Sequence, residues 1–122
     1  MCIRDRSAGV WFDTGVITSY NTVNYTKLDD NPEIINSFDK TVFLTAKIYL
    51  TICNSDNTNV SYKELVIIHN GTSATLYESS LTSVGVAINP TLQASVAGDQ
   101  IILTATCATG TKLKGNVSYL AI

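Results

Sequence analysis

The sequence is poor in the residues that build most catalytic, metal and disulfide sites. Among its 122 residues it has one histidine and three cysteines, and no Cys-x-x-Cys spacing. A hydrolytic triad needs a nucleophile, an imidazole and an acid to converge in space, and nothing singles out partners for the lone histidine, His69. Because His69 stands at the end of an expected strand, we interpret it as a surface or turn residue without a role in chemistry.

Charge and long apolar runs are scarce as well. Charged residues make up 15% of the chain and the net charge is −2, so no basic stripe exists to neutralise a phosphate backbone, and nucleic acid is not an expected partner. The longest mostly apolar runs, such as 65–68 and 101–103, are far shorter than the roughly 20 residues of a membrane-spanning helix. We expect no membrane span. The abundance of Thr, Ser and Asn is typical of extracellular or particle-bound β proteins.

No motif assembles a reaction centre. Glycoside hydrolysis needs two carboxylates at a set separation, but the ten acidic residues lie mostly in expected loops and single out no pair. The clusters Asp29-Asp30-Asn31 and Asn54-Ser55-Asp56-Asn57 are too short for a calcium loop. No glycine-rich turn from strand to helix exists to hold a nucleotide phosphate. We expect no catalytic residue, no cofactor-binding residue, no metal ligand and no enzymatic activity.

The chain has the length of one compact domain. Residues 1–6, Met-Cys-Ile-Arg-Asp-Arg, resemble the translated adapter prefix of fragmentary metagenomic reading frames, and they lack the apolar segment of a secretory signal. We interpret residues 1–6 as non-native and assign 7–122 to a single domain, the C-terminal piece of a longer protein. Cys53 and Cys107 end two expected strands and could meet across a sheet, but small packing residues are the preferred interpretation.

Alternation of apolar and polar residues is the main pattern present. Between Val42 and Cys53, five aliphatic residues occupy every second position: Leu44, Ala46, Ile48, Leu50 and Ile52. A period of two predicts a half-buried strand, whereas a helix would scatter these side chains around its circumference.

Further strands follow as hairpins. The run 60–69 predicts a central strand, Asn70-Gly71 predicts a two-residue type I′ turn, and 73–78 predicts the returning strand. The runs 92–96 and 101–107 predict a second hairpin around Gly98-Asp99. A last strand, with Leu113, Val117, Tyr119 and Ala121 on one side, follows a turn at 108–111.

The N-terminal part is less regular. Residues 15–20 and 22–26 predict one or two strands interrupted around Asn21. The segment 29–35 is the single helical candidate, because Asn31 can cap a helix and Pro32 suits its first position. Strands spaced by about 8 to 12 residues predict an all-β fold, an antiparallel β-sandwich or jelly roll of about eight strands.

The aromatic residues allow two interpretations. Five of them are candidates for stacking on a sugar if several line one exposed sheet face: Trp11, Phe12, Tyr20, Tyr25 and Tyr49. Aromatic residues also fill β cores and pair across strands, and this structural interpretation is the more common one.

One arrangement resembles a known family. It consists of residues 46–50, a polar loop, the run 63–78 with its Glu-x-apolar-apolar-apolar-His-Asn-Gly-Thr core, and residues 98–106. This pattern is similar to a β domain of structural proteins of tailed bacteriophages, including tail-fibre-like proteins. The resemblance implies a virion domain, on the particle surface or in the tail, whose partners are other virion proteins or copies of itself, with a host-surface glycan or protein as a further partner.

The leading hypothesis is therefore a structural or tail-fibre-like virion domain that acts by assembly and host-surface attachment. Its loops 54–59 and 70–71 are the first candidates for partner contact. The alternative is a carbohydrate-binding module separated from a larger surface enzyme, in which Trp11 or Tyr49 would bind sugar.

Overall fold

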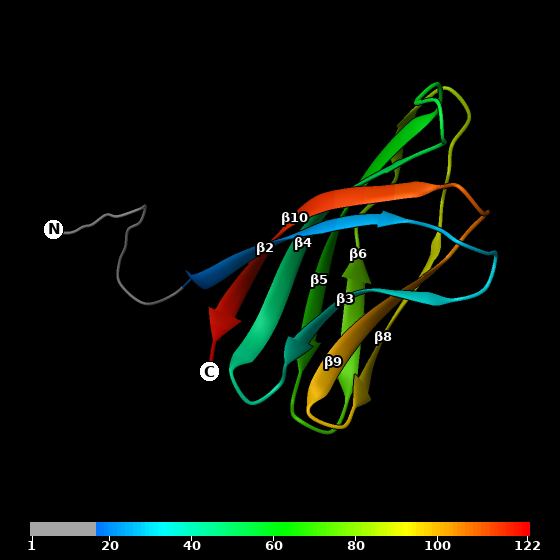
Figure 1. The fold of residues 1–122 in the computed structure, drawn as a ribbon. Helices are drawn as coiled ribbons and strands as arrows, with labels where there is room; N and C mark the ends of the chain where they lie inside the picture. Colours follow the sequence, from blue (N-terminus) through cyan, green and yellow to red (C-terminus); the bar gives the residue numbers. More distant parts are fainter. Residues whose placement is uncertain (1–16) are drawn as a thin grey trace, which may run out of the picture.

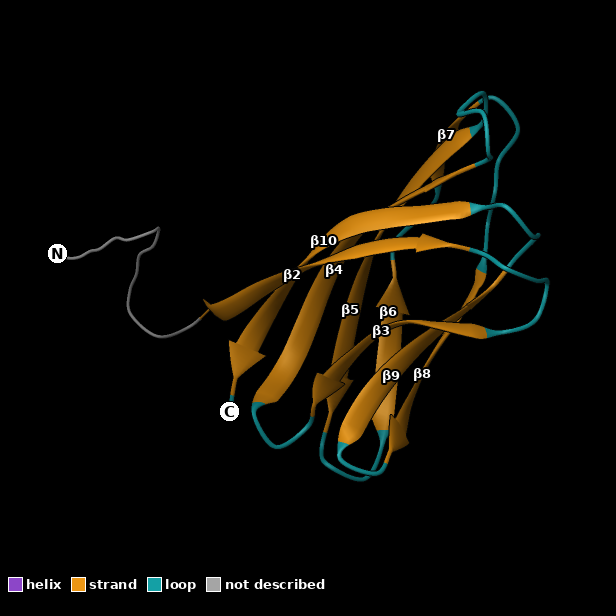
Figure 2. Cartoon of the chain, in the orientation of Figure 1, coloured by secondary structure: helices purple, strands orange, loops and turns teal. Residues whose placement is uncertain are grey.

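The computed structural model describes residues 17–122, which form nine β-strands and no helix (Figures 1 and 2). No helix in this part of the chain could cross a membrane. The strands are β2 (Ile17–Thr26), β3 (Glu33–Asp39), β4 (Phe43–Cys53), β5 (Val60–His69), β6 (Ala74–Glu78), β7 (Thr82–Val84), β8 (Thr91–Ala97), β9 (Gln100–Thr106) and β10 (Lys112–Ala121). The expected all-β class is confirmed.

The strands form two antiparallel sheets that pack face to face. The larger sheet has the order β2-β10-β4-β5-β6, and β7 pairs with the other end of β5, beyond β6. The smaller sheet has the order β3-β9-β8 and lies in front of the larger one in Figure 1. Two sheets packed in this way form a β-sandwich, so the architecture is the one that the strand spacing predicts.

The core lies between the inner faces of the two sheets. Every second residue of the central strands is buried, as the alternation predicts, because successive side chains of a strand point to opposite faces. The larger sheet contributes Val23, Ala46, Ile48, Leu50, Ile52, Leu65, Ile67, Leu113, Val117 and Tyr119, and the smaller sheet Ile35, Phe38, Leu92, Ile101, Leu103 and Ala105.

Leu44 departs from this alternation, since 42% of its surface is exposed. The ladder between β4 and β10 pairs Leu120 with Thr45 and then Ala121 with Phe43, so Leu44 is skipped. Such a bulge places two residues of one strand opposite one residue of the other and changes which side chain points inward. Phe43 packs against the core in place of Leu44, with its ring stacked on Tyr119 at 4.7 Å between centroids.

The helical turn expected over 29–35 is wrong. Residues 28–31 form bends, and Glu33 begins β3. Asp29 Oδ1 accepts a hydrogen bond from the Asn31 N–H at 2.8 Å, which closes a turn typical of Asp and Asn. Pairing with β9 then holds the segment that follows in extended conformation, so tertiary contacts override the local capping signal.

Two further expectations, a break in the first strand and the type of one hairpin turn, need correction. The interruption expected at Asn21 is absent, because β2 pairs with β10 from Lys112–Thr26 to Ser118–Tyr20 without a break. The Asn70-Gly71 hairpin is not a two-residue type I′ turn: His69 pairs with Ala74, so the loop has four residues, 70–73. Of the two central residues expected, only Gly71 has a positive φ, 92°, whereas a type I′ turn requires both.

A buried lysine holds the loop after β2 in place through an ion pair and hydrogen bonds. Lys27 is 1% exposed, and its Nζ lies 2.9 Å from Glu33 Oε1 and donates to the carbonyl oxygens of Asn31 and of Ala105 on β9. Tyr25 donates its hydroxyl hydrogen to Glu33 Oε2 at 3.0 Å. This network satisfies the charge of a lysine that the sandwich removes from water.

Candidate functional site

Four exposed tyrosines lie on the face of the larger sheet that points away from the core, which we call the outer face. The exposed fractions are 73% for Tyr20, 40% for Tyr49, 36% for Tyr62 and 61% for Tyr77. They come from β2, β4, β5 and β6 respectively. Exposed aromatic rings gathered on one face are a mark of binding surfaces, since a protein gains little stability from leaving such rings in water.

The register of the sheet explains why these side chains share a face. Residues paired across antiparallel strands point to the same side. One row across the sheet consists of Tyr20, Ser118, Lys47, Val66 and Tyr77. The next row consists of Thr22, Asn116, Tyr49 and Glu64, and the third of Asn24, Lys114, Thr51 and Tyr62.

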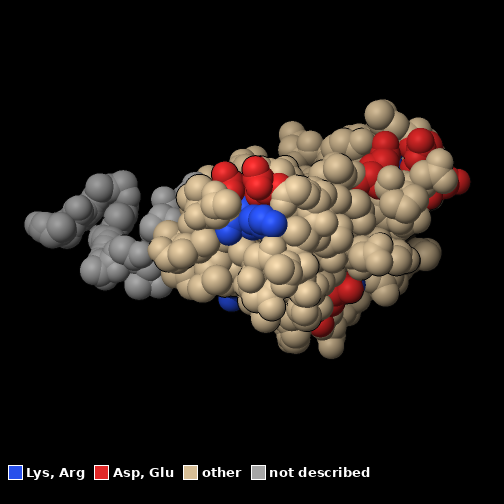
Figure 3. All heavy atoms as spheres, turned by 90° about the horizontal axis from the view of Figure 1, so that it is seen from below, with Lys and Arg blue, Asp and Glu red and all other residues tan. Residues whose placement is uncertain are grey.

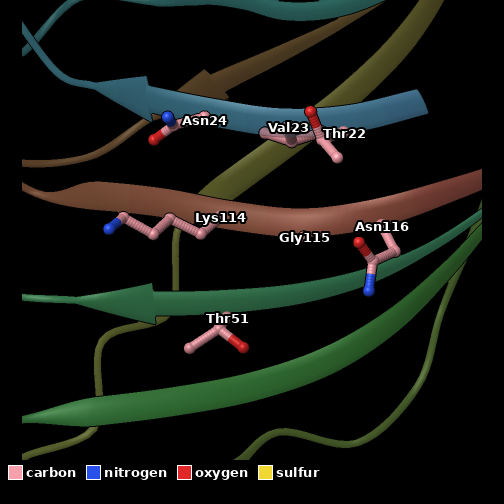
Figure 4. Close-up of a pocket in the computed structure, with 7 residues that line it drawn as sticks. All are labelled: Thr22, Val23, Asn24, Thr51, Lys114, Gly115 and Asn116. Carbon is pink, nitrogen blue, oxygen red and sulfur yellow. The ribbon is translucent and has the colours of Figure 1, made fainter.

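A shallow depression lies between the second and third rows (Figure 4). Its rim carries amide, hydroxyl and ammonium groups from β2, β10 and β4, and its floor includes Gly115 and Val23. The side chains on the rim are those of Thr22, Asn24, Thr51, Lys114 and Asn116.

Gly115 is required at the floor for a steric reason. A Cβ atom built on Gly115 would lie 2.0 Å from the backbone carbonyl oxygen of Tyr49 on the neighbouring strand. Real Cβ atoms do not approach a backbone oxygen so closely, so β10 and β4 can adopt this contact only around a glycine.

Some charged side chains on the outer face contact a neighbouring side chain, and one has no partner of opposite charge. Lys47 Nζ lies 5.3 Å from the centroid of the Tyr49 ring, a cation–π distance, and Tyr62 donates its hydroxyl hydrogen to Glu64 Oε2 at 3.4 Å. Partial burial, together with the nearby Glu64 carboxylate, raises the pKa of the Tyr62 hydroxyl. Lys114 is exposed and has no ion pair with any acidic residue in 17–122. Charged groups elsewhere are sparse, and in the view from below they form small separate patches (Figure 3).

The structure brings together some of the aromatic residues that the sequence singled out. Tyr20 and Tyr49 share the outer face, whereas Tyr25 lies on the inner face of β2 and packs against the core. Trp11 and Phe12 lie outside the described residues. Sequence analysis missed Tyr62 and Tyr77, because residues on different strands are seen to share a face only once the register of the strands is known.

His69 has a structural role in the loop it precedes. Its Nε2 lies 2.7 Å from the carbonyl oxygen of Phe43, and its Nδ1 accepts a hydrogen bond from the Gly71 N–H at 3.0 Å. Both ring nitrogens are therefore used in joining the loop 70–73 to the start of β4. These contacts place His69 at the end of β5, beside the loop, where the sequence leads us to expect it.

The cysteines of the described chain carry no cross-link. Cys53 is buried and Cys107 packs against the core, and both are free thiols, as the packing interpretation predicts. Burial raises the pKa of the Cys107 thiol, which favours its unreactive protonated form. Within residues 17–122, no three His, Cys, Asp or Glu side chains gather in a way that could hold a metal ion.

No protein-family model matches the chain, and no curated protein matches it. Solved structures do. The tailspike protein of Acinetobacter baumannii phage AM24 aligns with a TM-score of 0.52 and 9% identity over 87% of this chain and 26% of that one. The tailspike protein of Acinetobacter phage vB_ApiP_P1 aligns with a TM-score of 0.54 and 16% identity over 98% of this chain and 25% of that one.

A further tailspike, from Acinetobacter baumannii bacteriophage Fri1 and described as a capsular polysaccharide depolymerase, aligns with a TM-score of 0.40 and 16% identity over 82% of this chain and 16% of that one. That score supports no inference. At these low identities the first two likenesses show a shared fold and nothing more. The chain spans about a quarter of the length of those two tailspikes. The all-β fold expected from the sequence therefore also occurs in parts of two phage tailspikes.

Proposed function

We propose that the chain is a β-sandwich domain of a phage tail protein, fibre-like or spike-like, that belongs to the virion and acts by binding. The fold shared with two phage tailspikes supports this proposal, and a span of about a quarter of their length suits one domain of a larger protein. The observation that carries the proposal is the outer face, which exposes four tyrosines and holds a polar depression with Tyr49 and Tyr62 beside its rim.

The proposed action is attachment to a host surface, with assembly into the virion through other faces. The loops 54–59 and 70–73 stay candidates for contacts with virion proteins or copies of the chain, because they are polar and largely exposed at the ends of the sandwich. We assign no catalytic step to the chain.

A cell-binding assay tests the attachment. The chain, fused to a fluorescent protein, is incubated with a panel of encapsulated bacterial strains and with mutants that lack surface polysaccharide. We expect saturable binding to at least one strain, reduced at least about tenfold by replacing Tyr49 and Tyr62 together with alanine. A matched control is Tyr25→Phe, which changes a tyrosine on the inner face. If the chain showed saturable binding to none of the strains, this result would contradict the proposal.

The alternative, a carbohydrate-binding module of a larger surface enzyme, is favoured by the same outer face. The genes that flank the coding sequence distinguish the two functions. Neighbouring tail or capsid genes would support the virion domain, whereas a fused or adjacent glycosidase would support the module.

A further inference from the structure

The depression on the outer face combines three kinds of group that together select a ligand. Two amides, two hydroxyls and one ammonium group line it, contributed by three adjacent strands (Figure 4). Within residues 17–122, the hydrogen bonds and ion pairs of the structure leave the Lys114 ammonium group without an acidic partner. An unpaired cation at the rim of a polar depression favours a ligand that carries an anion.

The cations of the outer face outnumber its carboxylates. Lys47, Lys112 and Lys114 point outward from β4 and β10. Glu64 lies in the second row, between the rows of Lys47 and Lys114. Asp56 in the loop 54–59 lies near Lys112, whose charge helps to lower the pKa of that carboxyl group. Lys47 is engaged with the Tyr49 ring. This local excess of positive charge lies in a chain whose net charge is −2, so it belongs to the outer face and not to the molecule as a whole.

The amides and hydroxyls suit a sugar ring. Asn24 and Asn116 each offer donors and an acceptor, and Thr22 and Thr51 offer hydroxyls that both donate and accept. Vicinal hydroxyls of a sugar need such mixed partners. Phosphates, which only accept, would leave the acceptor groups of this rim unused, so the rim favours a saccharide over a nucleic acid.

The tyrosines extend the site beyond the depression. Tyr49 is paired with Asn116, and Tyr62 is paired with Thr51, so both rings stand next to the rim on the β4–β5 side. A tyrosine ring offers an apolar face for the C–H groups of a sugar and a hydroxyl for hydrogen bonding. Successive residues of a glycan chain can therefore follow the outer face from the depression across these rings.

We propose that this depression binds a carboxylate-bearing sugar of an acidic polysaccharide, with Lys114 pairing with the carboxylate. The inference rests on the proposed function and deepens it by naming the ligand class and the residue that selects it. A neutral glycan would leave the Lys114 charge unused, and its affinity would not depend on that residue.

The test uses an array of oligosaccharides that contain glucuronic, galacturonic, mannuronic or sialic acid, each beside its carboxyl-reduced form. We expect the chain to bind at least one acidic oligosaccharide and to lose at least about tenfold in affinity when the carboxyl groups are reduced. Lys114→Gln should cause a similar loss for the acidic form and almost none for the reduced form. Salt screens exposed charges. Raising NaCl from about 50 to about 500 mM should therefore reduce the affinity of the parent protein for the acidic oligosaccharide more than it reduces the affinity of the Lys114→Gln variant.

Lys112→Gln is the matched control, because Lys112 lies two residues away on the same strand and face but does not line the depression. We expect the affinity of Lys112→Gln for the acidic oligosaccharide to stay within about twofold of that of the parent protein. Equal losses in both lysine variants, or equal binding of acidic and reduced sugars, would overturn the inference. Binding to cells without binding to any acidic sugar would also overturn it while leaving the proposed attachment intact, and absence of both would reject the attachment as well.

Discussion

At the scale of single residues, the ion pair of Lys27 and Glu33 decides how the loop after β2 is held. The Lys27 side chain is fully buried, whereas Glu33 keeps 16% of its side-chain surface in water. Removing the carboxylate therefore leaves a buried ammonium group that cannot be rehydrated, and removing the ammonium leaves a carboxylate that can.

We predict that Glu33→Gln destabilises the protein more than Lys27→Met does. The glutamine keeps the size of the side chain but removes the opposite charge, and we expect its melting temperature to fall by at least about 5 °C relative to Lys27→Met. Thermal unfolding followed by circular dichroism measures the difference. Equal melting temperatures for the two variants would show that the pair contributes through packing alone.

At the scale of secondary-structure elements, the close approach of β10 to β4 depends on Gly115. We predict that Gly115→Ala lowers the free energy of unfolding by at least about 2 kcal/mol, because the added methyl group would overlap the Tyr49 carbonyl oxygen and push the two strands apart. Urea unfolding measures the change. Ser118→Ala, three residues along the same strand, serves as the control and should change stability by less than about 0.5 kcal/mol.

The loop between β5 and β6 depends on one side chain in a similar way. Asn70 Oδ1 accepts hydrogen bonds from the N–H groups of Thr72 and Ser73 and from the Thr72 hydroxyl. We predict that Asn70→Ala costs about 1 kcal/mol of stability, since these exposed donors can turn to water, whereas Asn70→Asp keeps the acceptor and costs less. Hydrogen exchange of the Ser73 amide would show the loss locally. Unchanged protection in Asn70→Ala would refute this role.

At the scale of the whole molecule, paired carboxylates make the fold sensitive to acid. Hydrogen bonds from Thr109, Thr41 and Thr58 lower the pKa values of Asp30, Asp39 and Asp56, respectively, and the bond from Lys27 lowers the pKa of Glu33. A carboxyl group whose pKa is lower in the folded state binds protons more readily in the unfolded chain. Its contribution to the free energy of unfolding is therefore complete above its ordinary pKa and is lost as the pH falls below that value.

We predict that the midpoint of urea unfolding is constant from pH 7 to about pH 5 and decreases progressively below about pH 4.5. Asp30→Asn should flatten this decrease, because Asp30 connects the loop after β2 to Thr109 in the β9–β10 loop through two hydrogen bonds of 2.8 Å. A midpoint that rises on acidification would contradict the assignment.

The sequence by itself determined the all-β class and most of the strands, because a strand buried on one face needs apolar residues at every second position, as between Ala46 and Ile52. Only the tertiary structure decided the rest. Pairing with β9 extended the segment after Pro32 against its helix-capping signal, and a bulge turned Leu44 outward. The candidate site was hidden for a related reason. Tyr49, Tyr62 and Tyr77 come from consecutive strands whose register depends on the loops 54–59 and 70–73, and Tyr20 joins their face only because β2 and β4 both pair with the distant β10.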